Sequence, residues 1–519
     1  MTKRRIPSAV LILFVLSAIG GYTTAAGAQP TTPVSCVASE KPDSTCNVIG
    51  GSAANQSARS ISGATISGGG ERDLPNRVTG DYGAIGGGHG NLAGDRATVS
   101  GGSNNAANGF RAVIGGGNNN LANGAYSTIA GGENNIASYY YASIGGGGSN
   151  ETSGRYSTIG GGSGNVASFT LATVAGGSNN TASSINSTVG GGDNNIATGA
   201  YSTVSGGSNN HASAFNTAVA GGSGNFATGD SATAGGGLSN RAYADYSTVA
   251  GGDANVAGSA NGDTKSAHYA TVSGGSHNAA TGAFSTIPGG AGNSAAGDYG
   301  FAAGRRALIN AAHAGTFLFA DSNDSDFVST AANEFAARAT GGVRFVTAID
   351  AVGNPSAGVR LSKGSGSWES LSDRNAKENI ALVDGRQIVA QLAAMPISTW
   401  NYKTQDPSIR HIGPMAQDFH ALGVGEDDKY IGMIDESGVA LAAIQGVYRM
   451  DQEQARQIAA LKSENAALKS RIDELDARMS AMERTQGANT ATSAAGNVPM
   501  TLALGGICLA ALAFVRSQH

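Results

Sequence analysis

The residues best suited to chemistry lie in the stretch Leu371–Ile380, which reads LSDRNAKENI. Ser372 and Lys377 are five residues apart in it. A serine hydroxyl becomes a nucleophile when a base takes its proton, and a lysine serves as that base when burial keeps its amine neutral. Ser-Lys pairs are a known form of the serine nucleophile. The spacing alone is common, and the plain alternative is a solvated loop with Ser372 as a helix N-cap.

Two further candidate groups, His411 and Asp418, follow in the same region. Gly413-Pro414 lies between them, and a proline interrupts a helix, so one continuous helix face does not hold both. We favour a structural role for both, in a domain core or a contact between chains. The eight histidines are scattered, and neither paired cysteines nor an HExxH motif is present, so we predict no metal site and no cofactor.

The elements that position these residues follow a long repetitive region. From Gly101 to Gly251 a Gly-Gly pair recurs every 15 residues, as in GGDNNIATGAYSTVS from Gly191. One such unit cannot bury a core and stacked units can, so the period predicts a β-solenoid. An insertion of about eight residues near 258–266 interrupts the period, which resumes at Gly274.

Each repeat predicts two short strands. The alternating run Tyr201–Val204 favours a strand with every second side chain inward, and Asn195 to Ala197 offers another. The Gly-Gly and Asn-Asn pairs supply corners with positive φ. No Gly-Lys-Ser/Thr follows the glycines, which excludes phosphate loops. The inward residues are small, so the core is thin, and its edges and weakly apolar faces favour association of several chains.

The repeats over Gly69–Arg306 resemble the head repeats of trimeric autotransporter adhesins, and the similar stretch ends in FAAGRR. The resemblance implies a mainly β fold, a left-handed parallel β-roll packed as a trimer. It does not identify a ligand for the rod. Such adhesins end in outer-membrane barrel strands of alternating hydrophobicity, which this sequence does not display, so self-transport across an outer membrane is not expected.

The N-terminal residues 1–28 read as an export signal. Basic residues precede an apolar run from Val10 to Ile19, and cleavage is expected after Ala28. An uncleaved anchor is the alternative. In the segment 29–68, Cys36 and Cys46 lie close enough to form a disulfide in an oxidising compartment.

The C-terminal segment 498–515 is almost wholly apolar, and its 18 residues predict a transmembrane helix. Arg516 directly after it favours the cytoplasmic side for the short end. Cys508 in this segment reads as a small hydrophobic residue. We therefore expect an exported chain anchored in a membrane by its C-terminal helix, with its bulk outside the cytoplasm.

The composition changes near residue 370, where glycine falls and charged residues and leucine rise. We expect a small β connector over 307–370. Within it, Phe335–Phe345 reads as a strand, a Gly-Gly turn and a second strand. Gly364–Ser367 reads as a flexible link.

The region of about 371–450 resembles the endosialidase-type intramolecular chaperone domain, peptidase family S74. The resemblance covers these blocks in the family's order: Leu371–Ile380, Trp400–Tyr402, His411–Phe419 and Gly438–Gly446. It implies a small α+β domain that trimerises, guides the folding of an upstream β fibre and then cuts itself off, with no external substrate.

The S74 resemblance also assigns roles to individual residues. It makes Ser372 the nucleophile, Lys377 its base and Leu371–Ser372 the broken bond. Neither position departs from the family's pattern.

A heptad repeat over 451–485 predicts a coiled coil, followed by a linker over 486–497. Its core positions are Ile458, Leu461, Asn465, Leu468, Ile472, Leu475, Met479 and Met482. The pattern by itself is typical of a parallel dimer, whereas both resemblances imply a homotrimer, which we favour. An amphipathic helix packed on a neighbouring domain is the alternative.

Together these features predict an exported trimeric fibre, matured by one self-cleavage per chain that frees the rod from its anchor. One alternative is a surface adhesin whose S74-like domain is an inactive trimerisation module. Another is a phage-derived tail fibre or spike. The net charge of −5 gives no basic footprint for nucleic acid.

Overall fold

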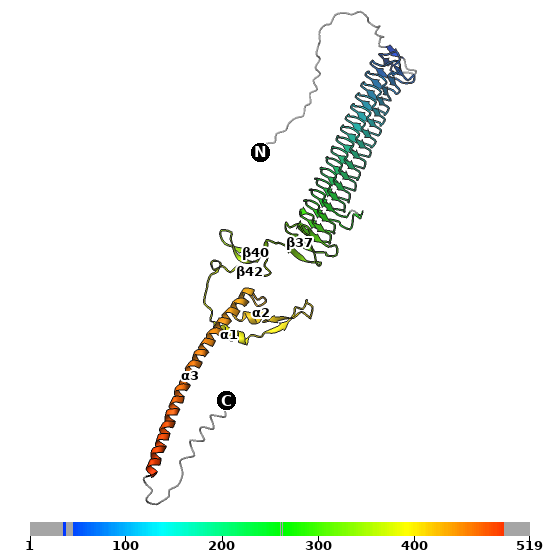
Figure 1. Ribbon diagram of the computed structural model, residues 1–519. Helices are drawn as coiled ribbons and strands as arrows, with labels where there is room; N and C mark the ends of the chain where they lie inside the picture. The colour runs from blue at the N-terminus through cyan, green and yellow to red at the C-terminus, as the bar shows by residue number, and fades with distance from the viewer. Residues whose placement is uncertain (1–34, 38–44, 260, 262, 492–519) are drawn as a thin grey trace. The chain divides into compact units, whose positions relative to one another are not determined.

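The computed structural model describes residues 35–37, 45–259, 261 and 263–491. They divide into two compact units, of which the first ends at Gly342 and the second begins at Val343 (Figure 1). The expected signal 1–28 and transmembrane segment 498–515 lie outside the described residues. Among the described residues, no helix is long and apolar enough to cross a membrane.

The first unit is a parallel β-solenoid of about 19 turns, which confirms the fold predicted from the repeat (Figure 1). Each turn adds one strand to each of two sheets, and successive strands pair in parallel, as Thr188 with Thr203 and Ala182 with Ala197. Sheet A contains β2 (Asn47–Ile49), β4 (Thr65–Ile66), β6 (Ala84–Ile85), β8 (Thr98–Val99), β10 (Val113–Ile114), β12 (Thr128–Ile129), β14 (Ser143–Ile144), β16 (Thr158–Ile159), β18 (Thr173–Val174), β20 (Thr188–Val189), β22 (Thr203–Val204), β24 (Ala218–Val219), β26 (Thr233–Ala234), β28 (Thr248–Val249), β30 (Thr271–Val272), β32 (Thr286–Ile287), β35 (Phe301–Arg305), β37 (Phe317–Ala320) and β39 (Phe335–Arg338), with β1 (Ser35–Val37) and β33 (Gly290–Ala291) at its margins.

Sheet B forms the opposite wall of the solenoid. It contains β3 (Gln56–Ser57), β5 (Arg77–Val78), β7 (Leu92–Ala93), β9 (Ala106–Ala107), β11 (Leu121–Ala122), β13 (Ile136–Ala137), β15 (Glu151–Thr152), β17 (Val166–Ala167), β19 (Thr181–Ala182), β21 (Ile196–Ala197), β23 (His211–Ala212), β25 (Phe226–Ala227), β27 (Arg241–Ala242), β29 (Val256–Ala257), β31 (Ala279–Ala280), β34 (Ser294–Ala295), β36 (Ala307–Ile309) and β38 (Phe327–Val328). The second residue of most of these strands is alanine, and it is buried. Facing residues of sheet A are valine or isoleucine in most turns, with Ala234 as one exception, so the core is as thin as the composition predicts.

The corners of each turn differ from the expectation in two respects. Tyr201, expected inside a strand, has φ 60° and forms a left-handed corner, and the strand begins at Thr203. Of the Asn-Asn pair, only Asn194 adopts positive φ, at 54°. Its neighbour Asn195 is fully buried. The two asparagines therefore have opposite roles.

Asn195 belongs to a buried ladder that ties each turn to the next. Its Nδ2 donates to the carbonyl oxygens of Gly191 and Gly207, both at 2.8 Å, and its Oδ1 accepts from the backbone N–H of Asn210 at 3.0 Å. The N–H to Oδ1 bond of this ladder links successive members of the series Asn76, Asn91, Asn105, Asn120, Asn135, Asn150, Asn165, Asn180, Asn195, Asn210, Asn225, Asn240, Asn255, Asn278 and Asn293. The carbonyl oxygens at the Gly-Gly corners are thus hydrogen-bonded by buried asparagine side chains.

The solenoid extends beyond the expected 69–306. It begins with β2 and continues to β39, so the expected connector 307–370 is divided between the two units. In the added turns, Phe301, Phe317 and Phe335 stack on one another with ring centroids 4.8 Å apart. The insertion lies where expected, because Thr248 pairs with Thr271, 23 residues later.

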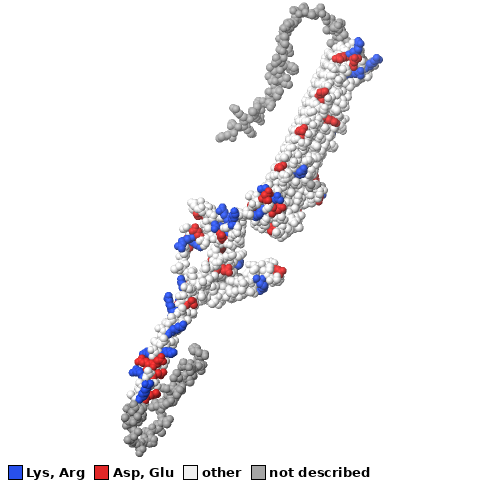
Figure 2. Space-filling view, in the orientation of Figure 1, with Lys and Arg blue, Asp and Glu red and all other residues white. Residues whose placement is uncertain are grey.

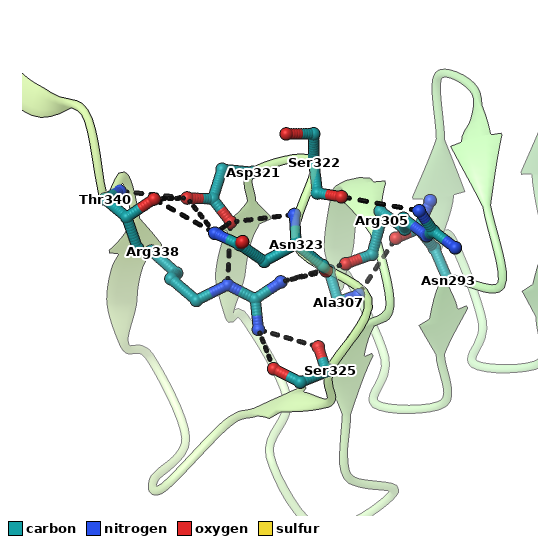
Figure 3. Close-up of polar contacts among 9 residues, drawn as sticks. All are labelled: Asn293, Arg305, Ala307, Asp321, Ser322, Asn323, Ser325, Arg338 and Thr340. Carbon is teal, nitrogen blue, oxygen red and sulfur yellow. Dashed lines mark hydrogen bonds and ion pairs between the residues drawn. The ribbon is translucent and has the colours of Figure 1, made fainter.

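A polar cluster closes the C-terminal end of the solenoid (Figure 3). Asp321 accepts hydrogen bonds from the backbone N–H and hydroxyl of Thr340, at 2.9 and 2.6 Å, and from Arg338 Nε at 2.9 Å. Arg338 in turn donates to the carbonyl oxygens of Ser325 and Asn323. The hydrogen bonds from Thr340, with those from Asn323 and Arg338, hold the pKa of Asp321 well below its usual range. This terminal lock joins three successive segments of the chain.

The second unit is a mixed α and β segment. Its elements are β40 (Gly342–Ile349), β41 (Pro355–Ser362), β42 (Trp368–Ser370), η1 (Arg374–Ala376), α1 (Gly385–Ala394), β43 (Ser398–Trp400), β44 (His411–Gly413), α2 (Ala416–His420) and α3 (Met433–Ala491). β40, β41 and β42 form one sheet, and β43 pairs with β44. The expected strand–turn–strand over Phe335–Phe345 consists of β39 and β40, which belong to different sheets.

The long helix α3 contains all of the expected coiled-coil segment, which confirms the helix. Association of this helix with other chains stays a prediction. Figure 2 shows charged side chains on the second unit, along α3 and at the two ends of the solenoid, whereas the visible face of the solenoid between its ends carries few. The composition change near residue 370 corresponds to this difference.

Candidate functional site

The backbone around Leu371 is held by the edge of the sheet of the second unit. Ser370, the last residue of β42, pairs with Val359 of β41. The N–H of Leu371 donates to the carbonyl oxygen of Gly358 at 3.0 Å. The ladder ends there, so the Leu371–Ser372 bond lies at the point where the chain leaves the sheet.

The short helix η1 follows at once and turns the chain back. Asp373 is its N-cap, and its carboxylate accepts from the N–H of Asn375 at 2.9 Å. The N-cap role considered for Ser372 is therefore filled by the next residue. Lys377 ends this turn, and its N–H donates to the carbonyl oxygen of Arg374 at 3.2 Å.

This turn brings the two predicted catalytic residues together. Lys377 Nζ lies 2.6 Å from Ser372 Oγ and donates a hydrogen bond to it. Both side chains are exposed. A nucleophile and a candidate base are thus in contact, and the single chain does not supply the burial that a lysine base requires.

Leu371 and Lys377 line an open cleft of about 340 Å³. Gly358 of β41, Asp373 and Ile434 at the start of α3 also line it. The cleft contains apolar and backbone atoms on the β41 side and charged groups on the η1 side. It leaves Leu371 partly exposed, at 38%.

Arg360 of β41 and Glu369 of β42 form an ion pair close to Leu371. Arg360 Nε lies 2.6 Å from Glu369 Oε2, across the β41–β42 pair. The hydrogen bond from Arg360, with one from Ser362, lowers the pKa of Glu369. This carboxylate is therefore engaged by the sheet, and it lines a second open cleft of about 360 Å³ together with Leu371 and Ser372.

His411 and Asp418 take no part in the Ser372–Lys377 contact. His411 Nε2 lies 3.0 Å from Gln405 Oε1, and its ring centroid lies 4.8 Å from that of Trp400. Asp418 lies in the first turn of α2, next to the buried Phe419. The geometry is that of a local aromatic cluster and a helix start, in line with the structural roles that we favour.

Cys46 is disulfide-bonded. The side chain of Cys36 lies outside the described residues, so the pairing of the two stays a prediction. Among the residues that the structure describes, no group of three or more His, Cys, Asp or Glu side chains could hold a metal ion.

Together the two units define a class of protein, a repetitive β-solenoid followed by a mixed α and β unit that contains a Ser–Lys pair. Residues 372–427 match the Peptidase_S74 family, described as the chaperone of endosialidase. The match begins at Ser372 itself and follows the long solenoid, which confirms the resemblance seen in the sequence. No curated protein matches the chain.

Proposed function

We propose that this chain forms an exported homotrimeric fibre, assembled by its S74 segment, which then cuts the Leu371–Ser372 bond. The observation that carries the proposal is the apolar surface that the second unit leaves uncovered. Among its described residues only Ile388, Phe419 and Val439 are buried apolar side chains. So small a core cannot stabilise a unit of this size alone.

The uncovered apolar side chains of the second unit are large and numerous. They include Ile380, Leu382, Val383, Ile397, Ile412, Tyr430, Met433, Ile434, Leu441, Ile444 and Tyr448. Exposed apolar surface of this extent marks contacts with other chains. A second and third copy of the same chain would cover it symmetrically.

The heptad positions of α3 support the same proposal. Leu461, Leu468, Ile472 and Leu475 are between 49% and 56% exposed along one stripe of the helix. In a coiled coil these side chains would fill the space between helices. We favour three chains because the solenoid resemblance is to trimeric heads.

The solenoid adds an independent argument, because equivalent outward positions can be compared from one turn to the next. The outward residue of sheet A is threonine in most turns, for example Thr188 and Thr203. The outward residue of sheet B varies freely, as Glu151, His211 and Phe226 do. A uniform column of small residues suits close approach of an identical chain, so sheet A is the proposed contact face.

Assembly would also complete the cleavage site. A lysine acts as a base when it is neutral, and removal from water favours the neutral amine. A neighbouring chain that covers the open cleft would remove Lys377 from water. Cleavage would then follow assembly, and it would free the rod from a C-terminal anchor over 498–515.

Mass measurement and light scattering of the full chain test the proposal. We expect a trimer, with fragments that end at Leu371 and begin at Ser372. Ser372→Ala should remain trimeric and uncut, whereas the nearby control Ser367→Ala should be cut normally. A trimer that is never cut supports the alternative of an inactive trimerisation module, and a monomeric chain refutes the proposal.

A further inference from the structure

One corner of the solenoid is lined by bulky side chains in an unfavourable backbone conformation. The corner residue has φ between 53° and 60° in Tyr82, Arg96, Arg111, Tyr126, Tyr141, Tyr156, Leu171, Asn186, Tyr201, Asn216, Ser231, Tyr246, Tyr269, Phe284 and Tyr299. Asparagine adopts this left-handed region readily and bulky residues do not. Asn186 and Asn216 show that the column accepts asparagine. The frequent tyrosines therefore indicate that their side chains have a role that offsets the unfavourable backbone conformation.

Stacking of the aromatic rings along this series of corner residues is one part of that role. The rings of Tyr126, Tyr141 and Tyr156 lie parallel, with centroids 4.8 and 4.9 Å apart. Such stacking stabilises the turns against the local strain. It also covers the faces of these rings and leaves their edges and hydroxyls exposed.

Stacking in the column does not explain the aromatic residues beside it. Tyr139 and Phe169 occupy a position that is glycine in other turns, such as Gly124 and Gly154. These two side chains and Tyr140 are 48%, 51% and 52% exposed. Replacement of glycine by a large exposed aromatic residue adds surface for contact and no core.

Three arginines lie on the same corner. The guanidinium of Arg111 is 5.2 Å from the ring centroid of Phe110, and that of Arg155 is 5.1 Å from the ring centroid of Tyr156. Arg96 also lies over the Phe110 ring, at 5.6 Å. No ion pair within the described part of the chain involves these three arginines. Asp81 and Asp95 lie on the same corner, so the three arginines leave an excess of one positive charge there.

We propose that this aromatic–arginine corner, formed by Arg96, Arg111, Tyr139, Tyr140, Arg155 and Phe169, binds an acidic polysaccharide. Guanidinium groups bind carboxylates and sulfates through paired hydrogen bonds. Exposed aromatic rings cover the apolar faces of sugars. Because turns repeat at about the 4.8 Å strand spacing, Arg111 and Arg155 are about 14 Å apart along the rod, which suits an extended chain better than a globular partner.

The other half of the same corner supplies an internal contrast. Its acidic residues Asp230, Asp245 and Asp298 each accept a backbone N–H from the preceding turn, at 3.2, 3.0 and 2.9 Å. Tyrosines stack there too, as Tyr246 does on Tyr269. Stacked aromatics without arginines therefore occur in the same chain, and we expect no binding of an acidic polymer to that half.

Binding of the full chain to polygalacturonate, dextran sulfate and neutral dextran tests the inference. We expect binding to at least one of the two acidic polymers and none to dextran. Comparison of the two acidic polymers separates carboxylate from sulfate recognition. The double variant Arg111→Gln/Arg155→Gln should weaken binding at least tenfold, and Tyr139→Gly/Phe169→Gly, which restores the glycine of other turns, should do the same.

Arg241→Gln is the matched control, because Arg241 lies 5.8 Å from the Phe226 ring centroid on sheet B. It should leave the affinity unchanged. Absence of binding to both acidic polymers at low salt, or an equal loss in Arg241→Gln, would overturn the inference. So would a change of oligomeric state in the corner variants, because the corner would then be a contact between chains. None of these outcomes depends on whether the chain cuts itself.

Discussion

The buried asparagine ladder gives the sharpest test of how the solenoid is held together. Asn195→Ala removes three hydrogen bonds, two donated to carbonyl oxygens and one accepted from a backbone N–H. Asn195 and the N–H of Asn210 are fully buried, so water does not replace the lost partners. The small alanine also leaves space at the Gly-Gly corner.

The expected effect follows from the number of lost bonds. At about 1 kcal/mol net for each, the variant loses about 3 kcal/mol of local stability. A loss of about 3 kcal/mol corresponds to roughly 150-fold more frequent opening of the affected turns. Because a solenoid turn contacts only its neighbours, the effect should be confined to the turns around residue 195.

Amide hydrogen exchange of the full chain, read by mass spectrometry, measures this opening turn by turn. Peptides over residues 190–212 should exchange faster, and peptides several turns away should not change. Asn194→Gly is the matched control, because the equivalent Gly164 and Gly224 already occupy that corner with positive φ. If Asn195→Ala exchanges no faster than Asn194→Gly, the ladder does not hold the turns together.

Three further predictions concern other parts of the molecule. The pKa of Asp321 is depressed, so the stability that its carboxylate contributes is present above the pKa of the unfolded state and is lost as the pH falls through the pKa of the folded state. Protection of the Asp321–Arg338–Thr340 cluster from amide exchange should therefore persist at pH 5–7 and fall only in strong acid. Asp321→Asn should remove this pH dependence. Gly446→Ala should weaken the packing of α1 on α3 and lower the melting temperature, because its methyl group would meet a backbone carbonyl of α1, whereas Gly438→Ala, with open space at its Cβ, should not. Thr203→Cys should form disulfide-linked chains on mild oxidation if sheet A is the contact face, and Ile196→Cys on sheet B should not; the reverse result would assign the contact to sheet B.

The solenoid could be predicted from the sequence because its 15-residue period and alternating residues act on every turn alike. The adjacent asparagines could not be told apart in this way. Asn194 and Asn195 are the same residue type, and only the direction of the corner decides which is exposed and which is buried. The alternating run Tyr201–Val204 predicts a strand over all four residues, but the corner geometry places Tyr201 outside it, with φ 60°.

The sequence does not predict the last turns as part of the solenoid, because they lack the Gly-Gly signal. There the stacked Phe301 and Phe317 and the Asp321–Arg338 pair replace the glycines and asparagines as the means of stacking. The family's motif predicts the Ser372–Lys377 pair, whereas five residues of spacing alone do not bring two side chains together. The short helix η1, capped by Asp373, brings the two side chains together, and no periodic pattern in the sequence predicts this helix.

The uniformity of the repeat bears on how chains could assemble in register. A shift of one chain by one turn would place threonine opposite threonine again, so sheet A distinguishes such a slip poorly. Register must then come from parts that do not repeat, namely the insertion near 258–266, the terminal lock and the second unit. Deletion of residues 191–205, one whole turn, should therefore leave trimer formation and cleavage intact, as measured by light scattering and fragment masses. If this deletion abolishes assembly, the repeats themselves set the register, and templating by the C-terminal unit is refuted.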